Sequence, residues 1–82
     1  MFFLALQELY KDYGPTRVAK KLNEILKNEK KIANYNVNNW INGSIPRAII
    51  QDAVIYLYIQ EKGEKKLQNL ISNYIHGIMA KF

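Results

Sequence analysis

Three breaks in an otherwise helical pattern constrain this chain most. Gly14-Pro15, the segment Gly43–Pro46 and Gly63 interrupt runs in which apolar residues recur every three or four positions. Glycine and proline are unfavourable inside a helix, although proline is tolerated in its first turn. The breaks divide the 82 residues into short helical segments. They therefore predict an all-α fold, a compact bundle of about five helices.

The expected helices follow from these breaks. The first covers about 2–13, and the second runs from Pro15 toward the charged segment KNEKK, which is either a fraying helix end or a loop. A short helix over 35–42 comes next. The segment 47–63 is rich in β-branched and aromatic residues, so a buried strand is an alternative there. We favour a helix, because the run is long and no partner strand is evident elsewhere in the sequence. The last helix covers 64–82.

Composition limits the function classes. The chain, 1–82, is long enough for one domain, and 49% of its residues are hydrophobic, so it should fold. It has no cysteine and one histidine, so we expect no metal and no cofactor. No glycine-rich phosphate loop, nucleophile–base pair or flanked carboxylate pair is present, which argues against an enzyme. No pocket for a small-molecule ligand is evident.

Charge and hydropathy indicate the cellular setting. The net charge of +5 favours polyanionic partners, namely nucleic acid or an anionic membrane surface. The start MFFLALQELY lacks the positive charge and the length of a signal peptide. The longest apolar run, AVIYLYI, is too short to cross a bilayer. We expect a cytoplasmic protein, and its small size and A/T-leaning composition would suit a viral or plasmid origin.

The segment NYNVNNWINGSIPR holds five asparagines around a small apolar set. Stepping about 100° per residue from Val37 places Trp40 and Ile41 on the same side of a helix. The opposite side then carries amides and a phenol, from Tyr35, Asn38, Asn39 and Asn42. An asparagine amide has a donor and an acceptor, and it pairs with adenine in the major groove of DNA. An A/T-rich genome is the alternative source of these asparagines, but it does not explain their position on one side.

The sequence GPTRVAKKLN followed by NVNNWINGSIPRA resembles the helix-turn-helix of the lambda-repressor and Cro-like superfamily. Ala19 and Leu22 match the small and hydrophobic positions of the first motif helix, and VNNWING matches the recognition helix. The resemblance implies a transcriptional regulator that binds double-stranded DNA. Here NEILKNEKKIANY lengthens the connection between the motif helices, either as extra helical turns or as an extended basic loop.

The resemblance also implies roles for individual residues. The residues that would contact bases are Tyr35, Asn38, Asn39 and Asn42. The residues that would contact phosphates are Thr16, Arg17, Lys20, Lys30, Lys31, Ser44 and Arg47.

The last expected helix carries a continuous apolar stripe that would form a dimer interface: Leu67, Leu70, Ile71, Tyr74, Ile75, Ile78 and Phe82. A homodimer is expected because so short a chain buries only a modest area by itself. Three alternatives stay open for this stripe. It would complete the core of the monomer if no second copy binds. It would bind a different protein if the chain is an inhibitor or adaptor, or it would lie on a membrane surface. The membrane alternative is weaker because the polar side of the helix is only slightly basic.

Overall fold

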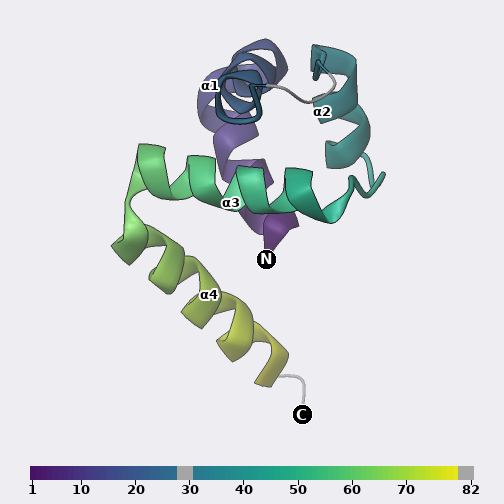
Figure 1. Ribbon diagram of the computed structural model, residues 1–82. Coiled ribbons are helices and arrows are strands. Elements are labelled where there is room, and N and C mark those ends of the chain that lie inside the picture. The colour runs from purple at the N-terminus through teal and green to yellow at the C-terminus, as the bar shows by residue number, and fades with distance from the viewer. Residues whose placement is uncertain (28–30, 80–82) are drawn as a thin grey trace.

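In the computed structural model the described residues form four helices (Figure 1). The structure describes residues 1–27 and 31–79. The helices are α1 (Phe2–Ile25), α2 (Asn34–Ile41), α3 (Ala48–Lys62) and α4 (Glu64–Met79). The described residues contain no strand, so the all-α prediction is confirmed and the strand alternative for 47–63 is wrong.

The predicted boundary at Gly14-Pro15 is a kink inside α1. Gly14 has φ 78° and ψ 168°, a conformation that residues with a side chain rarely adopt, and Pro15 restarts the helix without needing an N–H donor. No connecting loop separates the two halves, so residues 1–27 and 31–79 contain four helices where about five were expected. In Figure 1 the first half of α1 rises through the molecule, whereas its second half is viewed nearly end-on.

One apolar core joins α1, α2 and α3. Its side chains are apolar or aromatic, and no charged side chain is buried among residues 1–27 and 31–79. Fully burying a Leu, Val or Phe side chain stabilises a fold by about 1.5–3 kcal/mol. The buried residues are Ala5, Leu6, Leu9, Val18, Ala19, Leu22, Ile32, Val37, Trp40, Ala53, Val54, Leu57, Tyr58 and Leu67.

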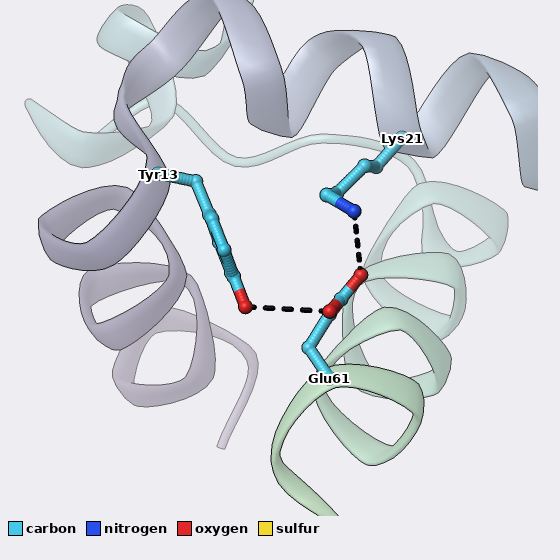
Figure 2. A network of polar contacts seen from close by, with 3 residues as sticks. All are labelled: Tyr13, Lys21 and Glu61. Atoms are coloured by element: carbon cyan, nitrogen blue, oxygen red, sulfur yellow. Dashed lines mark hydrogen bonds and ion pairs between the residues drawn. The ribbon is translucent and has the colours of Figure 1, made fainter.

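Polar contacts link residues on both sides of the α1 kink to the end of α3. Figure 2 shows Tyr13 and Lys21 of α1 pointing toward Glu61 of α3. Lys21 Nζ lies 2.7 Å from Glu61 Oε1, and the Tyr13 hydroxyl donates to Glu61 Oε2 at 3.3 Å. The hydrogen bond from Lys21 is the main reason that the pKa of Glu61 lies below its usual value. The carboxylate of Glu61, between α1 and α3, is therefore already paired.

Helix α4 is only partly covered by the rest of the molecule. Leu67 near its start is buried, and the next apolar residues, Leu70 and Ile71, are half-buried. Farther along, Tyr74 and Ile75 are each 46% exposed. α4 packs mainly against α3, and its far end projects away from the other helices (Figure 1). Phe82, the last residue of the predicted stripe, lies outside the described residues. Within the described ranges, no helix is long and apolar enough to span a membrane.

Candidate nucleic-acid interface

An asparagine from α1 fixes the chain that leads into α2. The Asn23 side chain accepts a hydrogen bond from Ile32 N–H at 2.7 Å and donates one to the Ile32 carbonyl at 2.8 Å. Ile32 is itself buried. α1 ends at Ile25, one turn beyond Leu22, and the described residues that follow, 26–27 and 31–33, are not helical. Residues 28–30, in the middle of the lengthened connection, lie outside the described residues.

The start of α2 is stabilised by an amide from within the helix. Asn36 Oδ1 accepts a hydrogen bond from Ala33 N–H at 2.9 Å, while Asn36 N–H donates to the Ala33 carbonyl at 3.0 Å. Such a reach-back contact satisfies a backbone donor that helix geometry leaves unpaired. The helix begins at Asn34, one residue earlier than predicted, and Asn42 forms its C-terminal cap.

The two sides of α2 differ as the sequence predicts, except that Asn38, which was expected on the outward side, is half-buried. Val37 is completely buried and Trp40 is 6% exposed, so the tryptophan belongs to the core and packs within the protein. On the opposite side, Tyr35 is 63% exposed, and Asn39 and Asn42 are exposed as well. α2 is thus held by a narrow apolar side and presents a phenol and two amides outward.

Three of the five asparagines in this segment have partners inside the protein. Asn36 caps the helix, and Asn34 Nδ2 donates to Thr16 Oγ1 over a long 3.5 Å. Asn38 Oδ1 accepts from the Tyr10 hydroxyl at 2.7 Å. Among the residues that the structure describes, the side chains of Asn39 and Asn42 have no hydrogen-bond partner. Some asparagines of this segment therefore stabilise the protein's own structure, whereas Asn39 and Asn42 face outward.

A shallow groove beside the start of α2 brings together several residues that were predicted to contact phosphates. Its polar lining includes Thr16, Lys20, Lys31, Asn34 and one acidic side chain, Glu24. The first three come from the predicted set and lie on α1 and on the connection to α2. Hydroxyl, ammonium and amide groups at this position are suited to phosphate oxygens.

The other predicted phosphate contacts are more scattered. Arg17 is exposed, and its guanidinium lies 5.8 Å from the centre of the Tyr13 ring. Ser44 and Arg47 are exposed beyond the opposite end of α2. Lys30 lies outside the described residues. The predicted set therefore flanks α2 at both ends rather than forming one cluster.

One exposed carboxylate, that of Glu24, lies in the groove beside the start of α2. The sequence has no Asp or Glu from Lys31 to Arg47. Three acidic residues on the α1–α3 side have partners: Asp12 pairs with Lys62, Glu8 accepts from the Tyr58 hydroxyl, and Glu61 pairs with Lys21. The outward side of α2 therefore presents neutral polar groups. The exposed amines of Lys20 and Lys31 and the carboxylate of Glu24 lie beside its start.

Sequence reasoning missed two residues that shape this surface, Asn23 and Tyr10. Both are bonded to residues that are distant in the sequence, Ile32 and Asn38. A polar residue on a helix has the same local pattern whether it faces water or such a partner, so no local signal distinguishes them.

No protein-family model, curated protein or solved structure matches this chain. A functional assignment consequently depends on the geometry and chemistry described above.

Proposed function

We propose that this protein binds double-stranded DNA in a sequence-specific manner, inside the cell, as a small transcriptional regulator that inserts α2 into the major groove. The observation that carries the proposal is the outward side of α2, where Tyr35, Asn39 and Asn42 are exposed. In the described part of the chain neither amide has a side-chain partner. The major groove accepts one helix and offers patterned donors and acceptors, to which free amides are complementary.

The way α2 is held supports the same function. A helix that reads bases must keep its position while it is pressed against the duplex. Val37 and Trp40 anchor α2 in the core, and Asn23 holds the connection before it. The second half of α1 and α2 would form the helix-turn-helix pair, with a longer connection between them than the family has.

The charged and hydroxyl side chains at the two ends of α2 would contact the phosphate backbone. Thr16, Lys20 and Lys31 lie beside its start, and Ser44 and Arg47 lie beyond its end. Phosphate contacts fix the position of a protein on the duplex, and each one adds to the salt dependence of binding. A helix flanked at both ends in this way would be oriented along the groove.

Two copies would bind together through α4. The exposed apolar side chains Tyr74, Ile75 and Ile78 continue the stripe whose start is buried against α3. A second copy would cover them, and a two-fold arrangement would present two α2 helices to successive major grooves, about 34 Å apart.

Fluorescence anisotropy with a duplex obtained by binding-site selection tests DNA binding. Asn39→Ala should weaken binding by about 1–3 kcal/mol at one base-pair position and relax the preference there. Lys20→Ala should weaken binding to all sequences alike and reduce the salt dependence by about one phosphate contact. Asn69→Ala, an exposed amide on α4, is the matched control. If selection from random DNA enriches no sequence, the proposal is wrong.

Sedimentation equilibrium tests the homodimer. Ile75→Lys on α4 should produce a monomer, because it places a charge in the proposed interface. Ile45→Lys, at an isoleucine that is 80% exposed outside α4, should leave the dimer intact. A wild-type protein that stays monomeric at high micromolar concentration would contradict dimerisation.

The same exposed stripe favours a second candidate function. A helical module that binds another protein would use Tyr74, Ile75 and Ile78 for that partner rather than for a second copy. The two functions differ in simple measurements. A monomer in gel filtration that enriches no DNA sequence supports the protein-binding module, whereas a dimer with sequence-selective DNA binding supports the regulator.

A further inference from the structure

The contact between Tyr10 and Asn38 orients one amide of α2. Tyr10 lies on the first half of α1 and is half-buried, and its hydroxyl reaches Asn38 across 28 positions of sequence. The oxygen–oxygen distance is 2.7 Å. This length is typical of an O–H···O bond, whereas N–H···O bonds centre nearer to 2.9–3.0 Å. The amide oxygen of Asn38 is therefore directed toward α1.

This orientation determines what Asn38 offers to a ligand. An amide carries its oxygen and its NH₂ group on opposite sides of one planar carbon, so fixing the oxygen also fixes the nitrogen. With Oδ1 turned toward Tyr10, the two N–H donors of Nδ2 point away from it. Within the described residues, Nδ2 of Asn38 has no hydrogen-bond partner. Asn38 is half-buried at the edge of the outward side, next to exposed Asn39 and Asn42.

We infer that Tyr10 is a specificity-determining residue that makes Asn38 a donor-only reader of bases. This inference rests on the proposed DNA-binding function. An asparagine that is free to turn pairs with adenine, because adenine offers a donor at N6 and an acceptor at N7. An amide that presents only donors instead matches guanine, whose N7 and O6 are both acceptors. Tyr10 does not touch the DNA; it acts through Asn38 as a positioning residue.

The inference predicts a base preference that depends on one hydroxyl group. Asn38→Ala identifies the base-pair position that Asn38 reads, since the preference at that position should disappear. In the wild-type protein this position should favour guanine over adenine by about 10-fold or more. Tyr10→Phe removes only the hydroxyl and lets the amide turn, so the guanine-to-adenine ratio should fall to within about threefold. Preferences at all other positions should not change.

The experiment measures the affinities of the full-length protein for duplexes that carry each of the four bases at each position of the selected site. Tyr13→Phe is the matched control, because it removes a hydroxyl hydrogen bond from the same helix that goes to Glu61 of α3 and not to α2. It should retain every preference of the wild type. The double variant Tyr10→Phe/Asn38→Ala should behave like Asn38→Ala alone, because two residues that act as one unit are not additive.

The outcomes separate this inference from the proposed function. A wild-type protein that selects a DNA site but favours adenine at the Asn38 position overturns the inference alone. The same holds if Tyr10→Phe leaves the guanine preference intact. A wild-type protein that selects no DNA sequence overturns both. If Tyr10→Phe unfolds at the assay temperature, the wild-type preference at the position identified by Asn38→Ala is the test. Guanine at that position supports the inference, and adenine overturns it.

Discussion

Replacing Asn23 by alanine tests how α2 is held in place. The substitution removes two hydrogen bonds to the backbone of Ile32, at 2.7 and 2.8 Å. Each contributes about 0.5–1.5 kcal/mol, and their loss leaves two backbone groups of a residue that is only 6% exposed without a partner. We expect a loss of about 2 kcal/mol in the free energy of unfolding. A domain of this size has roughly 4–12 kcal/mol in total.

Thermal unfolding followed by circular dichroism measures this loss. For a domain of this size, 1 kcal/mol corresponds to about 4–8 °C, so Asn23→Ala should lower the melting temperature by about 8–16 °C. Asn69→Ala is the control, because it makes the same change in helix propensity at an exposed position of α4. Asn23→Asp keeps an acceptor for Ile32 N–H but places a second acceptor against the Ile32 carbonyl. Its melting temperature should therefore lie below that of the wild type, either above or below that of Asn23→Ala. The reasoning fails if Asn23→Ala and Asn69→Ala melt within about 2 °C of each other.

Three further predictions concern the rest of the fold. Burial and, after it, a neighbouring carboxylate raise the pKa of Tyr58 to about 12. The folded state thus favours the neutral phenol of Tyr58. In urea unfolding of the wild type, the contribution of this phenol to the free energy of unfolding should be intact below pH 10 and lost as the pH rises through about 12. Tyr58→Phe should lack this loss. For Glu61 the sign is opposite: its hydrogen bond with Lys21 lowers the pKa, so its contribution is present above the usual 4.5 and is lost as the pH falls below it. Glu61→Gln should therefore lose less stability than wild type between pH 7 and pH 3, and an equal loss would contradict the assignment. Gly63, at φ 89° and ψ 156°, occupies a region that suits only glycine, so Gly63→Ala should cost about 1–3 kcal/mol in thermal unfolding. Gly77→Ala, inside a helix with open space around it, should stabilise by about 0.5–1 kcal/mol; melting shifts of the same sign for both variants would refute this comparison.

The sequence was sufficient to predict the all-α class and several residues of the core. Apolar residues at helical spacing identified Leu22, Val37 and Trp40 as inward-facing, and all three are buried. The prediction succeeds because apolar residues at helical spacing lie on one side of the helix, and that side is the one that is buried. The punctuation at Gly43 and Gly63 likewise corresponds to the ends of α2 and α3.

Other features were not predictable because they depend on distant partners. A Gly-Pro pair permits either a loop or a kink, and the choice at Gly14 depends on how the two halves of α1 pack. The apolar stripe of α4 identifies the side of the helix that faces inward. Where burial of this stripe stops, before Tyr74, depends on the position of α3. The asparagines of α2 divide between internal and outward roles according to contacts such as that of Asn38 with Tyr10. The role in DNA binding of the outward set, Tyr35, Asn39 and Asn42, stays a prediction.

The separation between the two sides of α2 has an evolutionary consequence. The anchoring of this helix depends on Val37, Trp40 and internal amide contacts, and none of these involves Asn39 or Asn42. Substitutions at the outward positions should therefore have little effect on the stability of the fold but should change which ligand the helix binds. Descendants of one ancestral chain would thus diverge in their targets through a few surface codons, with the scaffold beneath them retained.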